Sequence, residues 1–321
     1  MANRLYYLDN LKGLLIILVI LGHAIQFTLP DYENAFAFRF IYSFHMPLFF
    51  FISGYLANRG CFKKGVISKR VLQLLVPFVT WALIGPLLKS GTLDLAGFID
   101  TLLYPDKGLW FLYNLFVYSA IFTGVEWLHE KAKINRWIIV GGGYIVLGAL
   151  MVVFLTKFNC TQLCYHYIFF TVGYGYKTLS IQPKYRYLLL GGGIFAVLVP
   201  FWTTSGSPLF YTYINLGGAF AYLYRYGVQI IGMWFFFETG RRFLNSSMFF
   251  ISEYGTLTLG IYALQFSVLH HLFNFIGLDS IVLKISIEAI TATVICYILV
   301  KTIKCVPYLR LLLIGDANIN K

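Results

Sequence analysis

Long apolar stretches separated by short polar segments dominate the pattern along this chain. Ten stretches lie near the 20 residues that an α-helix needs to cross a membrane. Their approximate limits are 11–29, 40–57, 71–88, 108–127, 137–156, 162–180, 187–203, 211–237, 248–273 and 281–300. The pattern therefore predicts an all-α fold, a polytopic membrane helical bundle of about ten transmembrane helices. We expect one membrane domain over residues 1–321 and no soluble domain.

The composition supports a membrane protein. Hydrophobic residues make up 59% of the chain and charged residues only 12%, whereas soluble domains are about 25% charged. A soluble protein this apolar would have too little polar surface to cover itself. Topology and contact with anionic lipid explain the net charge of +12, so we expect membrane lipid as a partner and no nucleic acid.

The distribution of Lys and Arg predicts the orientation. With the N-terminus in the cytoplasm, most of the 25 basic residues fall on the cytoplasmic side, as the positive-inside rule requires. The predicted outer side keeps Arg39, Lys89, Lys107, Lys157 and Lys284. We therefore predict that both termini are cytoplasmic, an N-in and C-in topology.

Lys12 and His23 lie at the two ends of the first apolar stretch. Their spacing is close to three helical turns, so both fall on one stripe of a helix, about 16 Å apart along its axis. An ionisable residue inside a membrane span is a functional-site hypothesis by default. An imidazole can take a proton from a hydroxyl near neutral pH, because its unperturbed pKa is about 6.5.

His45 lies near the start of the second predicted span, at a depth similar to that of His23. The two histidines are thus candidates for one cavity, and Pro47 predicts a bend in the helix beside them. A hydrogen bond between helices is the simpler role for a lone membrane histidine. Two histidines at one depth, with Lys12 on the same stripe as His23, favour a functional site instead.

Basic residues gather in the predicted cytoplasmic loop between the second and third spans, among them Arg59, Lys69 and Arg70. Positive-inside topology accounts for most of this charge. Arg70 opens a span, however, where its guanidinium can point at a phosphate group. Arg241 and Arg242 form a second basic site on the same predicted face.

Three further residues are candidate substrate contacts. Arg225 and Glu288 lie within predicted spans, and a pair between them would be either a structural ion pair or a substrate contact. Trp110 opens the fourth span at its outer end, where the alternative role is the aromatic belt. The five cysteines form no ligand framework, so we expect no metal.

At these residues the sequence resembles the acyltransferase-3 family of bacterial integral membrane acyltransferases. That family carries a basic residue, ten residues and a histidine in its first membrane helix, matched here by Lys12 and His23. The matching segments of the first four helices are residues 8–13 and 22–24, then 44–50 and 53–56, then 69–70 and 74–78, and finally 110–112. The resemblance is specific over the first 115 residues.

The sequence also departs from the family pattern. Gln73 stands where many relatives have a second arginine, and Gln265 stands where many have a histidine. Some relatives carry a fused extracytoplasmic hydrolase-like domain, which we do not expect in this protein. Acyl transfer would then be completed by the membrane domain or with a separate partner.

The resemblance implies an O-acyltransferase, most simply an O-acetyltransferase, in the bacterial inner (plasma) membrane. The donor would be cytoplasmic acyl-CoA, with acetyl-CoA as the acyl donor substrate, and the acceptor a hydroxyl of a cell-surface glycan or lipid-linked saccharide. His23 would act as general base or carry the acyl group transiently, with His45 and Lys12 as further catalytic residues. The implied CoA contacts are Lys12, Arg59, Lys69 and Arg70, and the implied acceptor contacts are Trp110, Arg225 and Glu288.

Two other classes of protein stay open. A transporter or flippase of glycans or small anions would use the intramembrane His, Arg and Glu residues as a pathway. Against it, the sequence shows no paired interrupted helices in two halves, a common sign of transporters built from repeats. A structural scaffold would need no chemistry at all. Binding of acetyl-CoA separates the enzyme from the transporter.

Overall fold

The computed structural model describes residues 5–57, 65–92, 94–204 and 217–316. These residues form helices and connecting segments, and no strand is found among them. The all-α prediction is therefore confirmed for the described part of the chain. The helices gather into two compact units, one formed by Met1–Phe49 with Ile181–Tyr297 and the other by Phe50–Ser180 with Ile298–Lys321.

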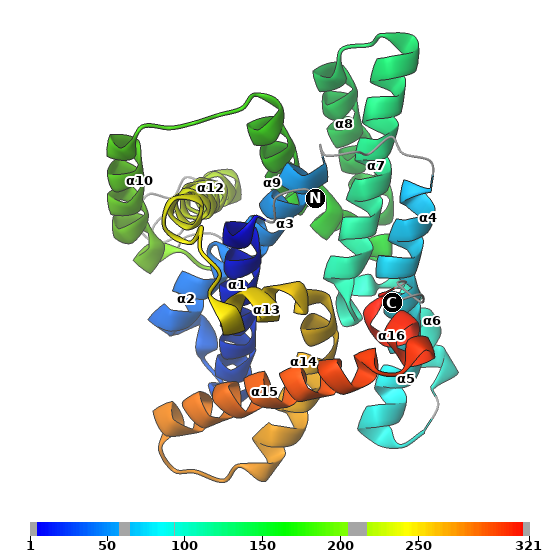
Figure 1. Cartoon of the computed structure of the whole chain (residues 1–321), viewed down its shortest axis with the longest axis vertical. Helices are drawn as coiled ribbons and strands as arrows, with labels where there is room; N and C mark the ends of the chain where they lie inside the picture. The colour runs from blue at the N-terminus through cyan, green and yellow to red at the C-terminus, as the bar shows by residue number, and fades with distance from the viewer. Residues whose placement is uncertain (1–4, 58–64, 93, 205–216, 317–321) are drawn as a thin grey trace. The chain divides into compact units, whose positions relative to one another are not determined.

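The first unit is built around α1 (Tyr6–Thr28), a continuous helix that packs along α13 (Phe249–Thr256) and α14 (Thr258–Phe275) (Figure 1). The α1 helix also contacts the short α2 (Phe36–Tyr42) and α12 (Gly217–Phe243). The remaining elements of this unit are η1 (Tyr32–Asn34), the first turn of α3 (His45–Ala57), α10 (Tyr185–Leu198), η5 (Val199–Phe201) and most of α15 (Ile281–Lys304).

Close backbone approach and a buried amide hold α1 against α13. A Cβ atom at Gly13 would lie 2.1 Å from the carbonyl oxygen of Ile251, so only glycine fits this contact. Small residues allow such approach between membrane helices. Asn10 is fully buried, and its side-chain amide donates to the carbonyls of Leu244 and Ser246, both at 2.8 Å. The Ser252 hydroxyl donates to the Asn10 side-chain oxygen, so this amide fixes the predicted cytoplasmic end of α1.

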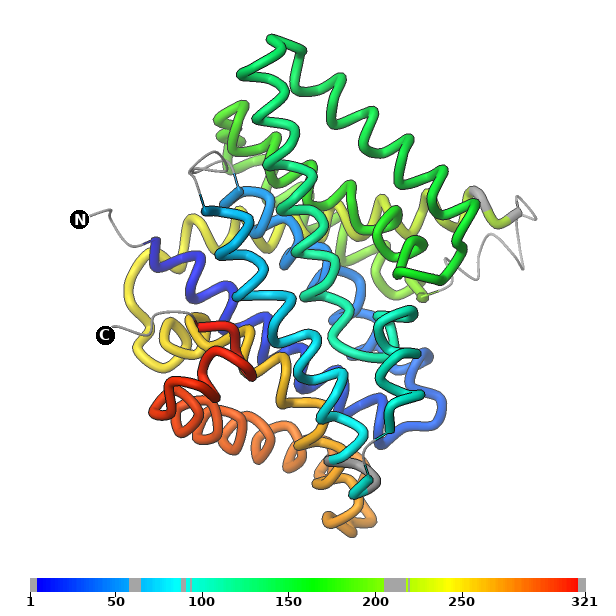
Figure 2. Tube along the Cα trace, turned by 90° about the vertical axis from the view of Figure 1, so that its right-hand side faces the viewer, coloured from blue at the N-terminus to red at the C-terminus, as the bar shows by residue number. Residues whose placement is uncertain are grey.

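The second unit contains a long hairpin of α7 (Trp110–Ala132) and α8 (Arg136–Phe154) (Figure 2). The α9 helix (Cys160–Thr178) packs against both. The other elements are the rest of α3, α4 (Val66–Arg70), the π-helical turn η2 (Val71–Leu75), α5 (Val76–Ser90), α6 (Leu95–Leu103), η3 (Pro105–Lys107), η4 (Lys157–Asn159) and α16 (Pro307–Ile314). The α16 helix docks on α5, where the Trp81 indole N–H donates to the carbonyl of Leu313 at 2.9 Å.

Six helical segments within the described residues are long and apolar enough to cross a membrane. They are Tyr6–Thr28, Phe36–Ala57, Val66–Leu87, Trp110–Ala132, Arg136–Phe154 and Ile281–Lys304. They coincide with six of the ten predicted spans. The other four predicted spans fall on α9, on α10 with η5, on α12, and on α13 with α14. Residues 211–216 of the span predicted over 211–237 lie outside the described residues. The number of ten spans and the N-in, C-in orientation remain predictions.

The second of these segments is interrupted. The α2 helix ends at Tyr42 and α3 begins at His45, with Ser43 and Phe44 between them. Pro47 falls in the first turn of α3, where its missing N–H is tolerated. The sequence predicts a bend beside Pro47, whereas the structure has a break before it. Tyr42 is the last residue of α2, and His45 is the first residue of α3.

Candidate active site

His23 projects from α1 toward polar partners that stand beside it. Its Nδ1 lies 2.8 Å from Oε1 of Gln26 and 3.4 Å from the hydroxyl oxygen of Tyr42. Phe266 of α14 meets the imidazole edge-on, with ring centroids 5.7 Å apart. The side chain is half-buried, so these contacts fix the ring while part of the side chain stays accessible.

His45 is buried at the start of α3 and only 2% exposed. Its Nδ1 lies 2.7 Å from the carbonyl oxygen of Ile41. A carbonyl oxygen only accepts, so Nδ1 carries the hydrogen and Nε2 of the neutral ring holds the lone pair. This hydrogen bond spans the break between the two helices, because it joins the first residue of α3 to the last turn of α2.

Tyr42 stands between the two histidines. Its ring centroid lies 6.4 Å from that of His23 and 4.7 Å from that of His45, and both contacts are edge-on. Tyr42 thus contacts both imidazole rings. That the two histidines share one cavity, and that they are catalytic, stay predictions.

Lys12 lies on α1 eleven residues before His23, and the helix is continuous between them. Its ammonium forms an ion pair with the carboxylate of Asp9, one turn earlier, at 3.1 Å. Both side chains are partly exposed. The ammonium is thus held in place by a carboxylate from the same helix end.

Lys69 and Arg70 lie in the second unit, at the end of α4. Lys69 is exposed, and Arg70 is half-buried and donates to Oε1 of Gln73 at 3.3 Å. The Gln73 carbonyl oxygen packs against Gly315 after α16, where a Cβ atom would approach within 2.2 Å. Arg59, the remaining predicted phosphate ligand, lies outside the described residues.

Glu288 is fully buried on α15, near the end of α1. Thr28 donates its hydroxyl to one carboxylate oxygen at 2.8 Å, and the ammonium of Lys284 lies 4.0 Å from the other. The ion-pair partner of this carboxylate is therefore Lys284, one turn away on the same helix. Arg225 lies on α12, with its guanidinium carbon 5.8 Å from the centre of the Trp202 ring.

Trp110 begins α7 and packs in an aromatic cluster of the second unit. Its ring lies 5.1 Å from that of His166 and 6.0 Å from that of Phe50. Nδ1 of His166 lies 3.0 Å from the Gln162 carbonyl, so it donates that hydrogen. Trp110 is half-buried at the start of α7, and its ring is held by these aromatic partners.

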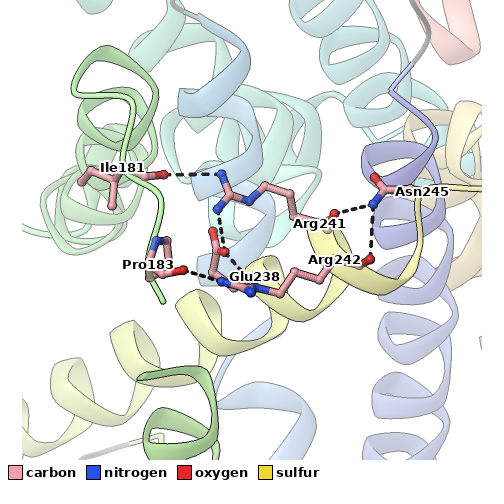
Figure 3. Close-up of polar contacts among 6 residues, drawn as sticks. All are labelled: Ile181, Pro183, Glu238, Arg241, Arg242 and Asn245. Carbon is pink, nitrogen blue, oxygen red and sulfur yellow. Dashed lines mark hydrogen bonds and ion pairs between the residues drawn. The ribbon is translucent and has the colours of Figure 1, made fainter. Parts of the chain in front are cut away.

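Arg241 and Arg242 close the end of α12 around a buried carboxylate (Figure 3). Glu238 is fully buried and lies 2.8 Å from the Arg241 guanidinium and 3.7 Å from that of Arg242. The two guanidiniums also donate to the backbone carbonyls of Ile181 and Pro183. These arginines thus tie the segment before α10 to α12, which the sequence alone shows only as a basic site.

The structure adds residues that the sequence argument does not single out. Gln26 and Tyr42 contact His23, Asn10 anchors α1, and His166 packs on Trp110. A signal for one of them exists in the spacing. Gln26 follows His23 by three residues on the continuous helix α1, the separation that places helical side chains on one face.

A family model described as an acyltransferase domain matches residues 5–303. The chain belongs to the acyltransferase-3 family. This confirms the family predicted from Lys12, His23 and the segments of the next three helices.

Two curated relatives, both named nodulation protein NolL, match part of this acyltransferase-3 chain. The protein from Mesorhizobium japonicum is 32% identical over 193 residues, which cover 56% of this chain and 49% of the relative. The protein from Sinorhizobium fredii is 33% identical over 187 residues, 54% of this chain and 48% of the relative. The chain thus spans about half the length of the curated relatives it matches. No solved structure matches it.

Proposed function

We propose that this protein is a membrane O-acyltransferase that moves an acyl group, most simply acetyl, from cytoplasmic acyl-CoA to a glycan hydroxyl. The acceptor is a cell-surface glycan or a lipid-linked saccharide, and the membrane is the bacterial inner membrane. Membership of the acyltransferase-3 family and the apolar helices support this proposal. The observation that carries it is the placement of His23 and His45 on either side of Tyr42.

The proposed reaction needs one proton acceptor near the acceptor hydroxyl. Nε2 of His23 takes the hydroxyl proton while the oxygen attacks the thioester carbonyl carbon. The C–S bond then breaks, and the proton passes from His23 to the departing CoA thiolate. An alternative order, in which His23 first carries the acyl group, uses the same nitrogen as the nucleophile. His45 orients His23, donates to the developing oxyanion when protonated, or contacts the acceptor.

Basic side chains at the predicted cytoplasmic side are the proposed phosphate ligands. Arg70 offers a planar fork of donors that suits a phosphate group, and the exposed Lys69 adds a point charge. Lys12 would exchange its contact with Asp9 for a phosphate oxygen, or contribute its charge without leaving the pair. Arg59 stays a proposed ligand on its sequence position alone.

Contacts to the acceptor are assigned to three residues. In the first unit these are Arg225 and Glu288, and in the second unit Trp110. Glu288 has one carboxylate oxygen without a hydrogen-bond donor among the described residues, which suits it to a sugar hydroxyl. An indole ring such as that of Trp110 offers a flat apolar face with an N–H group at its edge.

Donor use is the decisive test. Purified protein in detergent, wild type beside His23→Ala, is tested for acetyl-CoA binding by calorimetry and for release of free CoA thiol. We expect both proteins to bind and only the wild type to release thiol. His271→Ala is the matched control, since this exposed histidine bonds its own helix backbone and its loss should leave both readouts unchanged. Absence of acetyl-CoA binding by the wild type would reject the proposal.

The second candidate is a transporter of glycans or small anions. The break between α2 and α3 favours it, because interrupted helices line substrate paths in many transporters. A transporter needs no acyl donor. Uptake of labelled saccharide into proteoliposomes, together with no thiol release, would therefore replace the acyltransferase with this second function.

A further inference from the structure

Gln26, one turn beyond His23 on α1, accepts hydrogen bonds from two side chains. The Tyr42 hydroxyl donates to Oε1 of Gln26 at 2.6 Å. Nδ1 of His23 lies 2.8 Å from the same oxygen. An amide oxygen has two lone pairs and no hydrogen, so Nδ1 of His23 must be the donor in the second bond.

This bond decides the tautomer of His23. With its hydrogen on Nδ1, the neutral imidazole holds the lone pair on Nε2. The Tyr42 oxygen, 3.4 Å from Nδ1, stands close to the same N–H. The proton acceptor of the ring is therefore directed away from Gln26 and Tyr42.

Tyr42 is itself fixed from three sides. The Phe38 ring stacks on it with centroids 4.0 Å apart, and His45 meets it edge-on at 4.7 Å. Gly22, the residue before His23, leaves the space that the Tyr42 ring fills. A Cβ atom at Gly22 would lie 2.7 Å from Cε2 of that ring.

We infer that Gln26 and Tyr42 are positioning residues that hold the hydrogen of His23 on Nδ1 and thereby direct Nε2 toward the acceptor hydroxyl. The inference rests on the proposed function for the role of Nε2, whereas the tautomer itself stands on the hydrogen bonds alone. When His23 takes a proton, the same two oxygens remain as acceptors for Nδ1–H. Gln26 is thus the counterpart of the group that orients a catalytic histidine in other acyl-transfer sites.

The tautomer is measured directly, without any turnover. Protein carrying ¹³C,¹⁵N-histidine is reconstituted in lipid, and the His23 signals are assigned by their loss in His23→Ala. We expect ring shifts of the Nδ1–H tautomer in the wild type at alkaline pH. In Gln26→Met, which keeps the length of the side chain and removes the acceptor, we expect a mixture of tautomers. An Nε2–H tautomer in the wild type would overturn the inference, whether or not the protein is an acyltransferase.

Kinetics then test the positioning role. We expect Gln26→Met and Tyr42→Phe each to lower kcat about 10- to 100-fold, a usual cost of losing an orienting partner, with KM for acetyl-CoA within about twofold. Gln26→Glu keeps an oxygen acceptor and should retain most of kcat, which a purely structural role would not predict. Equal losses in Gln26→Glu and Gln26→Met would overturn the inference. Gln182→Met and Tyr222→Phe, at exposed positions, are the matched controls.

Discussion

Gly255 of α13 lies directly against the backbone of Asp9 on α1, where a Cβ atom would sit 1.8 Å from the carbonyl oxygen. Together with Gly13 it lets the two helices touch along their backbones. The helix that carries Lys12 and His23 is therefore positioned by contacts about three to four turns from the histidine.

Gly255→Ala should force α1 and α13 apart. We expect a loss of about 1–3 kcal/mol of unfolding free energy, the usual cost of an inserted methyl group in a packed interface. The measurement is the midpoint of thermal unfolding in detergent. Gly141→Ala on α8 is the control, because a Cβ atom there meets no atom within 4 Å. A midpoint for Gly255→Ala equal to that of the control would contradict the close contact.

Glu238→Leu should destabilise the end of α12. The carboxylate is fully buried and faces two guanidiniums, so its removal leaves both arginines without their anion. Breaking a buried ion pair in this way costs about 3–5 kcal/mol. Glu238→Gln keeps an acceptor and should lie between that variant and the wild type. Glu130→Leu, at an exposed position, is the control. The prediction fails if both leucine variants unfold at the same temperature.

Arg70→Ala should weaken the donor complex. A charged hydrogen bond contributes about 1.5–3 kcal/mol, so KM for acetyl-CoA is expected to rise about 10- to 100-fold. Arg70→Lys keeps the charge and should recover only part of the loss, because it lacks the planar fork. The measurement is thiol release against acetyl-CoA concentration at low and high salt. Lys131→Ala, exposed near the end of α7, serves as control. An unchanged KM in Arg70→Ala would remove Arg70 from the donor site.

The pKa of Lys107 in η3 lies above its ordinary value of 10.5, because its ammonium donates a hydrogen bond to Asp100 of α6. A raised pKa in the folded state means that the pair stabilises the fold fully below about pH 10.5. This stabilisation is lost as the pH rises through the folded value. We expect Asp100→Asn to lower the thermal midpoint slightly at pH 8, and the difference from the wild type to shrink as the pH rises above 10.5. The pair is exposed, so added salt should shrink the difference. A difference that does not shrink as the pH rises above 10.5 would contradict the assignment.

The sequence predicts the helical class of the described residues and the family of the chain well. Charge and apolar length are properties of single stretches, so the Lys12–His23 helix and its family match could be found without coordinates. The proximity of His23 and His45 also follows from their depth on consecutive spans. Tyr42 is different, because 24 tyrosines in one chain leave a single one without a distinguishing signal.

Partner choice among charged side chains could not be predicted. Glu288 is equally compatible with Arg225 by depth, and the fold gives it Thr28 and Lys284 instead. In the sequence, Arg241 and Arg242 indicate only a basic site. Nothing in the sequence marks Glu238 as their partner, because this residue becomes buried only when α12 folds. Such choices depend on rotation about each helix axis, which hydropathy does not encode.

The π-helical turn η2 changes the rotational phase of the third predicted span. A π-helical turn closes i→i+5 hydrogen bonds and so takes up one residue more than an α-helical turn. One residue of α-helix corresponds to about 100° of rotation. Lys69 and Arg70 therefore project from a different side of the helix axis than they would if α5 continued back to them as a regular α-helix. Deletion of the single residue Leu72 would keep every charge in the chain and yet swing both basic side chains to another face.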